Sequence, residues 1–444
     1  MIGLGKSGFA AAKFLMAKKA RPSVTDDSTN PKVLKNARAL EKLNMPVETG
    51  GHTASFIENA ELVVTSPGVP RRSLPLVLAK KKGIPVISEV ELASYFCQGI
   101  LVAVTGSNGK TTTSHLISQA LAAAGRPSVL CGNVGHAFLD FIPKIKKRTV
   151  VVLELSSFQL EDSPSLRPKI AVVLNIGRNH LDRHGTFKKY IRAKERIFSN
   201  QRQGDFTVLN YDDPLVRRMA KKTPAQVIFF SKKPLAKGVY LKNGQMIADI
   251  RSRKKLLIDS TRFRLKGAHN IENILAAVAV AAILGLPQER LEKSLNRFET
   301  LEHRIEPLGG YAGVQFVNDS KSTTVESTKA AILSLSTPII LIAGGKDKGV
   351  DFGGLEPLLK KHVKQVILYG EARKKIAGAW KWYRSARITE RFEEAVRLAY
   401  KSADPGDTVL LSPMCTSFDQ FGSFEERGEA FKEIVETLKR SGKN

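Results

Sequence analysis

Short apolar runs alternate with stretches of helical periodicity along most of the 444 residues. Residues 100–104 predict a buried strand, and residues 112–124 carry apolar side chains at helical spacing, with Gly125 as a stop. Two early runs, 61–70 and 84–88, predict strands that end in turns. Further strands are predicted at residues 149–153, 170–174, 314–317, 338–343, 365–369 and 407–411.

This alternation is typical of α/β domains and predicts three of them. We place the first at residues 1–97, the second at 98–299 and the third at 300–444. Within the second, residues 227–263 alternate like a small β-meander with a polar turn at Lys242-Asn243-Gly244. The chain is long enough for each domain to bury its own core.

A glycine-rich loop joins the strand at 100–104 to the helix at 112–124. Its residues are Thr105-Gly106-Ser107-Asn108-Gly109-Lys110-Thr111-Thr112. Backbone N–H groups at a helix start bind phosphate, Lys110 adds charge, and the Thr111 hydroxyl can ligate Mg²⁺. Val104 stands where the strict phosphate-loop pattern has its first glycine, and a chance match in a surface loop is the alternative. The flanking strand and helix favour a nucleotide site.

Two polar residues follow the next predicted strands. Glu154 comes directly after residues 149–153, and His180 follows 170–174 by a few residues. In an open α/β sheet, such positions converge where ligands bind. A structural histidine is the alternative for His180, but its neighbours favour a functional one.

The first residues contain the pattern G-x-G-x-x-G at Gly3, Gly5 and Gly8, followed by Asp26 at a spacing seen for ribose-binding acids. The strand expected before Gly3 is missing. We therefore expect either a truncated first strand in a Rossmann-like domain or a translation start further upstream. Alone, this motif is weak evidence for a dinucleotide site.

Charge and cysteine content restrict the function classes. The chain has 70 Lys and Arg against 42 Asp and Glu, a net charge of +28. The basic clusters are scattered without interleaved aromatics, so solvated basic faces are favoured over a nucleic-acid surface, and no nucleic-acid partner is expected. The positive electrostatic field of the chain would favour an anionic substrate.

Three distant cysteines predict neither a disulfide framework nor a zinc site.

No membrane association is expected from the sequence. The longest uncharged apolar stretch, residues 274–286, is too short to span a bilayer. Lysines interrupt the first apolar residues, so no secretory signal is predicted. These features and the unpaired cysteines predict a cytoplasmic protein.

Several stretches taken together resemble the Mur ligases, in their order and over essentially the whole chain. The Ser157-to-Glu161 and Asp419-to-Phe421 stretches resemble the D-glutamate-adding branch, and the Asp-Asn-Pro-Arg motif of diaminopimelate- and lysine-adding relatives is absent. The stretches that carry the resemblance are Ser66-Pro67-Gly68, 105–112, 154–161, 180–183, Lys194, His269-Asn270, His303-Arg304, 318–321 and 411–421.

The resemblance implies an α/β fold of three domains: a Rossmann-like UDP-binding domain, a central P-loop ATPase domain with a parallel sheet and a small β-meander, and a C-terminal Rossmann-like domain. It also implies an ATP-dependent amide ligase of cytoplasmic peptidoglycan precursor synthesis. ATP would phosphorylate the carboxylate of UDP-N-acetylmuramoyl-L-alanine, and the amine of D-glutamate would attack the acyl phosphate. One chain suffices for this reaction, so a monomer is expected.

The resemblance assigns catalytic roles to Lys110, His180 and Lys194. Thr111 and Glu154 would hold one Mg²⁺, and His180 and Lys194 would go with a second one that also contacts Glu154. An ammonium cannot ligate Mg²⁺, so a carbamylated Lys194 is implied. A solvated helix lysine is the alternative for Lys194.

Three binding sets follow from the same carry-over. ATP would be bound by Gly106, Ser107, Asn108, Gly109, Lys110, Thr111, Thr112, Asn270, Arg304 and Asp319. The UDP-sugar would be bound by Lys6, Ser7, Asp26, Ser66 and Asn133, and D-glutamate by Thr323, Lys348, Ser417, Phe418 and Phe424. Asn179 replaces a usual Asp, and Asp27-Ser28 replaces a pattern that often includes Arg, which changes the charge near the second metal and the UDP.

Other functions remain open at this point. Another Mur ligase or a folylpolyglutamate synthase-type ligase would share the central domain. A dehydrogenase would leave the second glycine loop unexplained, and a nucleic-acid-binding ATPase would depend on net charge alone.

Overall fold

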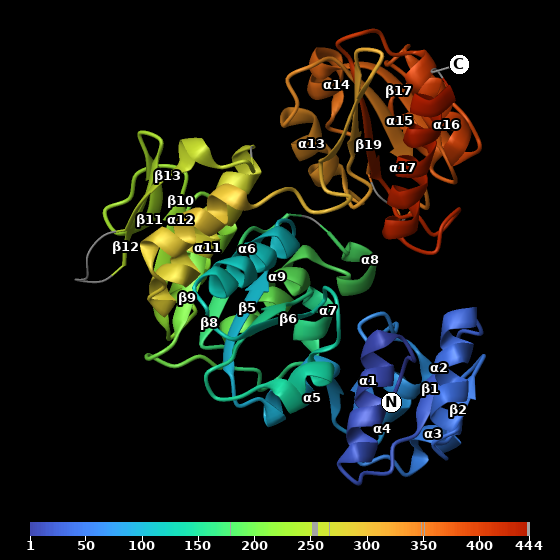
Figure 1. The fold of residues 1–444 in the computed structure, drawn as a ribbon. Coiled ribbons are helices and arrows are strands. Elements are labelled where there is room, and N and C mark those ends of the chain that lie inside the picture. The colour runs from blue at the N-terminus through green and yellow to red at the C-terminus, as the bar shows by residue number, and fades with distance from the viewer. Residues whose placement is uncertain (178, 251–255, 266, 348, 350, 442–444) are drawn as a thin grey trace. The chain divides into compact units, whose positions relative to one another are not determined.

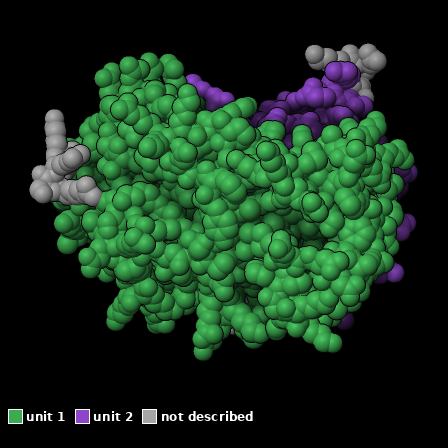
Figure 2. All heavy atoms as spheres, turned by 90° about the horizontal axis from the view of Figure 1, so that it is seen from below, with its two compact units in different colours: residues 1–263, 270–297 green, residues 264–269, 298–444 purple. Residues whose placement is uncertain are grey.

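The computed structural model describes residues 1–177, 179–250, 256–265, 267–347, 349 and 351–441. The chain divides into two compact units, coloured separately in Figure 2. The first unit comprises Met1–Phe263 and Asn270–Arg297, and the second comprises Arg264–His269 and Phe298–Asn444. The predicted boundaries at residues 97 and 299 remain predictions.

The first part of unit 1 contains two short parallel strand pairs joined through Ile2. Strand β1 (Val24–Asp26) pairs with β2 (Val47–Thr49), and β3 (Val63–Thr65) pairs with β4 (Val86–Ser88). Ile2 makes parallel bridges to both Thr25 and Thr65, so it occupies the place of a middle strand. The two alternatives given for this end, a truncated first strand and a translation start further upstream, remain predictions.

Helices flank these strands and begin at recognisable sequence signals. Asn30 accepts a hydrogen bond from the Val33 N–H at the start of α2, and Pro31 supplies the first turn. Ser88 caps α5 in the same way through the Glu91 N–H. The helices of this part are α1 (Lys6–Ala17), α2 (Pro31–Glu41), α3 (Ser55–Glu58), α4 (Leu74–Lys81) and α5 (Glu89–Phe96).

The rest of unit 1 is built on a nine-stranded sheet in the order β13-β12-β11-β10-β9-β8-β5-β7-β6 (Figure 1). All pairs from β6 to β11 are parallel, whereas β11, β12 and β13 pair antiparallel. The predicted meander is therefore confined to these last three strands. Their bounds are β5 (Ile100–Thr105), β6 (Ser128–Gly132), β7 (Val150–Glu154), β8 (Ile170–Val173), β9 (Phe206–Asn210), β10 (Gln226–Ser231), β11 (Gly238–Lys242), β12 (Gln245–Asp249) and β13 (Leu256–Asp259).

The central strands are mostly apolar, with polar residues at the ends of β5 and β7, because helices cover both faces of this sheet. Every residue of β7 and β8 is buried. Because β5 pairs in parallel with both β7 and β8, the carboxyl ends of these three strands meet at one edge, where the loops lead into α6, α7 and α8. The helices are α6 (Lys110–Ala123), α7 (Ser157–Glu161), α8 (Leu181–His184), α9 (Phe187–Glu195), α10 (Pro214–Arg218), α11 (Ala268–Leu284) and α12 (Gln288–Arg297).

Unit 2 is a six-stranded sheet in the order β14-β15-β19-β16-β17-β18, antiparallel only at β14. Apolar clusters cover both of its faces. No helix in the described part of either unit has the length and apolarity needed to cross a bilayer. The elements are β14 (Glu306–Tyr311), β15 (Val314–Asn318), α13 (Val325–Leu333), β16 (Ile339–Gly344), α14 (Glu356–His362), β17 (Val363–Tyr369), α15 (Arg373–Ala379), β18 (Ala386–Ile388), α16 (Phe392–Lys401), β19 (Thr408–Met414) and α17 (Phe424–Ser441).

Candidate active site

The glycine loop between β5 and α6 adopts a conformation that requires glycine at its last position. Gly109 is the N-terminal cap of α6 and has a φ of 81°. A Cβ on Gly109 would lie 2.2 Å from Oδ1 of Asn273 on α11. The helix start is therefore packed tightly, and no side chain at residue 109 shields its backbone N–H groups.

Neighbouring side chains hold the loop in shape. The Asn108 N–H donates to Oδ1 of Asn175 at 2.8 Å, and Nδ2 of Asn175 donates to the Asn108 carbonyl at 3.2 Å. The Ser107 hydroxyl lies 2.8 Å from the Tyr190 hydroxyl and accepts from the Gly177 N–H at 2.8 Å. The loop is thus preorganised by contacts from the segment after β8 and from α9.

Lys110 begins α6 and turns back along the loop. Its Nζ donates to the carbonyls of Gly106 and Ser107, both at 3.0 Å. Thr111 is half-buried and Thr112 is buried in the next positions. A cation and helix N–H groups on one loop form an anion site suited to phosphates.

Glu154, at the end of β7, is 1 % exposed. Nδ2 of Asn133 donates to its Oε1 at 2.7 Å, and among the described residues Oε2 has no hydrogen-bond partner. A buried carboxylate oxygen without a donor is costly and is the ligand type that Mg²⁺ prefers. Glu154 and Thr111 therefore fit a hard cation chemically.

Lys194 is buried as deeply as Glu154, at 2 % exposed. Its Nζ donates to the Gly106 carbonyl at 2.8 Å and to Oγ1 of Thr105 at 3.3 Å. Burial, followed by repulsion from Lys110, lowers the pKa of Lys194 well below its ordinary value. The solvated-lysine alternative is wrong.

His180 lies in the loop after β8 with a positive φ of 54°. Its ring packs edge-on against Phe158 of α7, with 4.8 Å between ring centroids. No three His, Cys, Asp or Glu side chains in the described part of the chain form a group that could hold a metal ion. The second Mg²⁺ at His180 therefore remains a prediction.

Asn270 and Asn273 stand one turn apart on α11 and face α6. Nδ2 of Asn273 donates to Oδ1 of Asn270 at 3.2 Å, and the Thr113 hydroxyl donates to Oδ1 of Asn273 at 3.2 Å. Both asparagines are buried. The structure thus places Asn270 beside the helix that carries the phosphate loop.

The predicted UDP-sugar residues of the first domain surround the start of α1. A Cβ on Gly8 would lie 1.8 Å from the Gly3 carbonyl, so glycine allows the helix to meet the turn closely. The Asp26 carboxylate accepts from the Leu4 N–H at 2.5 Å and from the Ser28 N–H at 2.8 Å. Asp26 therefore shapes the turn itself.

Three further residues of this set lie at or next to the same turn. The Ser66 hydroxyl donates to the Gly3 carbonyl at 3.1 Å, and Nζ of Lys6 donates to the Gly135 carbonyl at 3.3 Å. Ser7 is half-buried in the first turn of α1. Gly135 follows Asn133 closely, so Lys6 links the predicted UDP-sugar residues of the two parts of unit 1.

In unit 2, the loops after β15, β19 and β16 join at the carboxyl ends of neighbouring strands. The Met414 N–H donates to the Ser322 carbonyl at 2.9 Å, and the Lys346 N–H donates to the Thr416 carbonyl at 2.8 Å. Three residues predicted to bind D-glutamate, Thr323, Ser417 and Phe424, lie in or next to these loops.

The other two predicted D-glutamate residues are placed differently. Phe418 is 60 % exposed, whereas its neighbour Ser417 is buried. Lys348 lies outside the described residues. Its role as a carboxylate partner remains a prediction.

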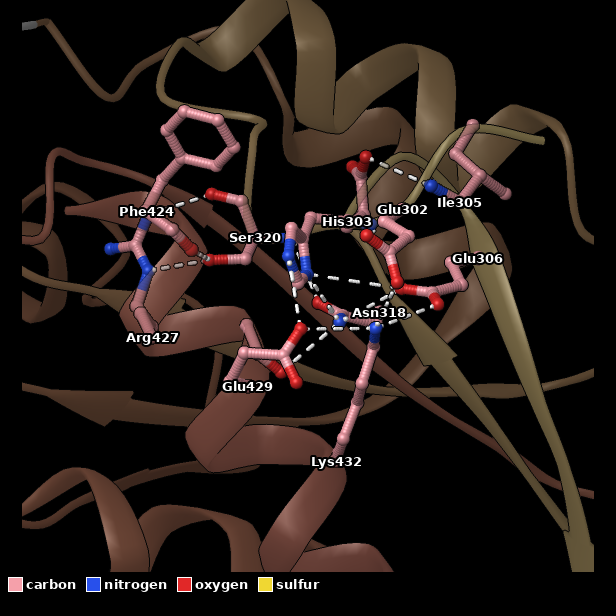
Figure 3. Close-up of polar contacts among 12 residues, drawn as sticks. Glu302, His303, Ile305, Glu306, Asn318, Ser320, Phe424, Arg427, Glu429 and Lys432 are labelled. Atoms are coloured by element: carbon pink, nitrogen blue, oxygen red, sulfur yellow. Dashed lines mark hydrogen bonds and ion pairs between the residues drawn. The ribbon is translucent and has the colours of Figure 1, made fainter.

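A buried arginine ties these loops to α17 (Figure 3). Arg427 is fully buried and donates through Nη2 to the Ser320 carbonyl at 2.8 Å and through both Nη atoms to the Cys415 carbonyl at 3.2 Å. The Ser320 hydroxyl in turn donates to the Phe424 carbonyl at 2.8 Å. The start of α17 is therefore fixed against the strand ends.

Asp319, predicted to bind nucleotide, is also buried in unit 2. Its carboxylate accepts from the Ser412 hydroxyl at 2.8 Å and from the Ile305 N–H at 3.2 Å. Burial raises the pKa of Asp319 to about 7, although hydrogen bonds from Ser322 and Ser412 and the charge of Arg304 oppose the rise. Arg304 therefore acts electrostatically on this carboxylate.

Comparison with known proteins identifies the family. Three family models match in succession: "Mur ligase MurD-like, N-terminal domain" at residues 1–88, "Mur ligase middle domain" at 104–281 and "Mur ligase, glutamate ligase domain" at 303–415. The UDP-N-acetylmuramoylalanine--D-glutamate ligase of Koribacter versatilis is 42 % identical over 439 residues, covering 99 % of this chain and 97 % of that one. The chain belongs to the Mur ligase family.

Other relatives agree with this assignment. The enzyme of the same name from Pelotomaculum thermopropionicum is 42 % identical to this Mur ligase, over 99 % of this chain and 97 % of that one. Among solved structures, MurC of Thermotoga maritima superposes with a TM-score of 0.63 at 19 % identity, covering 99 % of both chains. MurF of the same organism, in complex with ADP, superposes with a TM-score of 0.61 at 19 % identity, covering 98 % of both chains. These two structures confirm the predicted α/β fold class.

Several residues that support the site of this Mur ligase were not predicted from the sequence. Asn175 and Tyr190 hold the phosphate loop, and Asn273 packs against Gly109. Two of them had a usable signal: Asn175 directly follows a predicted strand, and Asn273 lies one helical turn after Asn270. Arg427 had none, because a charged residue on an amphipathic helix is usually exposed.

Proposed function

We propose that this Mur ligase joins D-glutamate to UDP-N-acetylmuramoyl-L-alanine in peptidoglycan precursor synthesis, with ATP converted to ADP and phosphate. The observation that carries the proposal is the 42 % identity to enzymes named for this reaction over 99 % of the chain. The phosphate loop and the buried Glu154 supply the groups that such a reaction requires.

The first step moves the γ-phosphoryl group of ATP to the carboxylate of the UDP-sugar substrate. A new oxygen–phosphorus bond forms, the bond to the β-phosphate oxygen breaks, and ADP leaves. The N–H groups at the start of α6 bind the phosphates, and Lys110 exchanges its carbonyl contacts for phosphate oxygens. Glu154 and Thr111 would hold Mg²⁺, which neutralises the charge on the phosphates.

The second step forms the amide. The neutral amine of D-glutamate attacks the acyl carbon, phosphate leaves with the bonding electrons, and the amine loses a proton to water. We assign D-glutamate to the loops of unit 2 that carry Thr323, Ser417, Phe418 and Phe424, with Lys348 as partner of a carboxylate. Asn270, Arg304 and Asp319 are assigned to the nucleotide.

We assign the UDP-sugar to the helix start and turn that carry Lys6, Ser7, Asp26 and Ser66, with Asn133. A helix N-terminus that lacks a side-chain cap suits a diphosphate. The proposal places the enzyme in the cytoplasm as a monomer, without membrane or nucleic-acid partners.

Lys194 is proposed to act as a carbamate. Its lowered pKa favours the neutral amine, which adds CO₂ and releases a proton to give an N-carboxylate. The carbamate oxygens would supply the hard ligands of a second Mg²⁺ together with His180 and Glu154. Carbamylation replaces one of the two hydrogens of the neutral amine, so Nζ would keep one hydrogen and one of its two present contacts.

Phosphate release tests the proposal. ADP and phosphate should form only when UDP-N-acetylmuramoyl-L-alanine, D-glutamate, ATP and Mg²⁺ are all present, and mass spectrometry should find the amide product. L-Glutamate should be a poor acceptor because two carboxylates and an amine define a handed site. Equal turnover with meso-diaminopimelate would assign a sister Mur ligase instead, and turnover of a folate would assign a folylpolyglutamate synthase-type enzyme.

A further inference from the structure

A series of polar contacts connects the loop after β3 to α7 and α8. Arg71 donates through Nη2 to Oε2 of Glu161 at 2.9 Å and through Nη1 to Oδ1 of Asp162 at 2.8 Å. Oε1 of Glu161 lies 3.1 Å from Nδ1 of His184, and Nε2 of His184 lies 2.9 Å from the Ser157 hydroxyl. None of these five residues has a role in the proposed reaction.

The contacts fix the tautomer and orientation of His184. Burial alone would raise the pKa of Glu161, but hydrogen bonds from His184 and Arg71 outweigh it and lower the pKa to about 2. Glu161 is therefore ionised at neutral pH and can only accept, so Nδ1 of His184 carries a hydrogen. A ring held at both nitrogens cannot rotate without breaking these contacts.

The order Glu161–His184–Ser157 has the hydrogen-bond pattern of a hydrolase triad. Ser157 is 2 % exposed and His184 is 3 % exposed, so a substrate carbonyl cannot reach the hydroxyl. Ser157 is also the first residue of α7, held within the helix start. Burial therefore favours a positioning role over nucleophilic catalysis.

The His184 ring packs against two aromatic side chains that contact active-site loops. Its centroid lies 5.4 Å from that of Tyr190, whose hydroxyl bonds Ser107 of the phosphate loop. It lies 5.6 Å from that of Phe158, against which His180 packs. One imidazole thus contacts both residues that orient these loops.

The other end of the series reaches the predicted UDP-sugar turn. Arg71 stands five residues after Ser66, in the loop that follows β3. Nη1 of Arg183, the residue before His184, donates to the Val69 carbonyl of the same loop at 2.8 Å. Arg183 is therefore connected to this loop directly, and the adjacent His184 is connected to it through Glu161.

We propose that His184 is a positioning residue that couples occupancy of the UDP-sugar turn to the geometry of the phosphate loop. The inference rests on the proposed function, because it assumes that the turn at Ser66 binds the UDP-sugar. When the UDP-sugar orders the turn, it fixes the position of Arg71. Arg71 in turn fixes Glu161 and, through it, His184. His184 then holds Tyr190 against Ser107. Such coupling is reciprocal, so nucleotide must favour UDP-sugar binding by the same factor.

Calorimetry with a non-hydrolysable ATP analogue and Mg²⁺ tests this coupling. The analogue is titrated into the full chain with and without saturating UDP-N-acetylmuramoyl-L-alanine. In the wild type, the UDP-sugar should raise analogue affinity about fivefold or more, the usual lower end of such coupling. In Arg71→Ala this factor should fall to about one, while analogue affinity without the UDP-sugar stays within about twofold of wild type.

Arg71 is 38 % exposed on its side chain, so this variant should fold. Arg72→Ala is the matched control: it removes the same charge from the exposed neighbouring position and should keep the wild-type factor. His184→Gln should also lose the coupling and raise the KM values for ATP and UDP-sugar, with the KM for D-glutamate unchanged. A general packing defect would instead raise the KM values for all three substrates.

A wild-type coupling factor of one, or an Arg71→Ala factor equal to that of the wild type, would overturn the inference. The amide-forming assay is run on the same wild-type sample. Absence of product there counts against the proposed function, because the coupling is measured by binding alone.

Discussion

Nδ2 of Asn133 lies 2.7 Å from Oε1 of Glu154, so a residue assigned to the UDP-sugar holds the carboxylate assigned to Mg²⁺. The parallel pairing of β6 with β7 sets Gly132 opposite Glu154 and brings Asn133 to this position. The other carboxylate oxygen is buried without a partner among the described residues. The contact with Asn133 therefore fixes the orientation of the Glu154 carboxylate and leaves Oε2 for a cation.

Glu154→Gln should fold normally and lose most of the ligase activity. The amide keeps the shape of the side chain but removes the negative charge, and the loss in kcat should be on the order of 10²-fold or more.

Asn133→Ala should weaken apparent Mg²⁺ affinity about 10-fold, as for other residues that orient a metal ligand. Mg²⁺ titrations of phosphate release measure both effects. Normal Mg²⁺ dependence in Glu154→Gln would remove this carboxylate from the metal site.

Lys110→Ala should lower kcat by about 10²-fold or more, because a charge that stabilises the transferring phosphoryl group is lost. The side chain is half-buried, and its Nζ donates to the carbonyls of Gly106 and Ser107 on its own loop, so we expect thermal stability to change little. The measurement is steady-state phosphate release beside a melting curve. A folded variant with near-normal turnover would contradict the phosphate-loop assignment.

Much of the architecture could be predicted from local patterns. The strand at 100–104, the glycine loop and the following helix appear in the structure as β5, the loop and α6. Such elements depend on apolar periodicity and glycine, which are visible in the sequence. The convergence of Glu154 with the glycine loop also followed, because carboxyl ends of parallel strands share one edge.

Contacts set by tertiary pairing could not be predicted. Asp26 was expected to bind the UDP-sugar, and its carboxylate accepts two N–H groups of its own turn and loop. A solvated helix lysine was the alternative for Lys194, but the side chain is buried against the end of β5. Helical spacing gives the face of a residue but not the element that packs against that face.

Glu89→Gln should stabilise the protein near neutral pH and have little effect in acid. Glu89, on α5, is buried and accepts from the Leu139 N–H, and burial raises its pKa from 4.5 to about 7. Between these pH values the folded state binds a proton that the unfolded state has lost, so wild-type stability falls as pH rises. The fall is largely complete above pH 7 and amounts to at most about 3 kcal/mol.

Denaturant unfolding at pH 4.5, 6 and 8 measures this difference. The advantage of Glu89→Gln over wild type should grow across the series. Glu58→Gln, at an exposed position, is the control and should follow the wild type. A pH-independent difference would mean that Glu89 is not protonated in the folded state.

Lys194→Ala should be nearly inactive, and small carboxylates should partly restore it. Removing the side chain opens space beside Thr105 and Gly106, where formate or acetate can supply the oxygens of the lost carbamate. Lys194→Met is the matched control, because it fills the same space with an apolar chain and should be inactive without rescue. Lys110→Ala should not be rescued either, since a cation is missing there. Phosphate release measured against formate concentration distinguishes these variants. Full activity of Lys194→Ala without added carboxylate would mean that Lys194 supports the loop through its two hydrogen bonds and supplies no metal ligand.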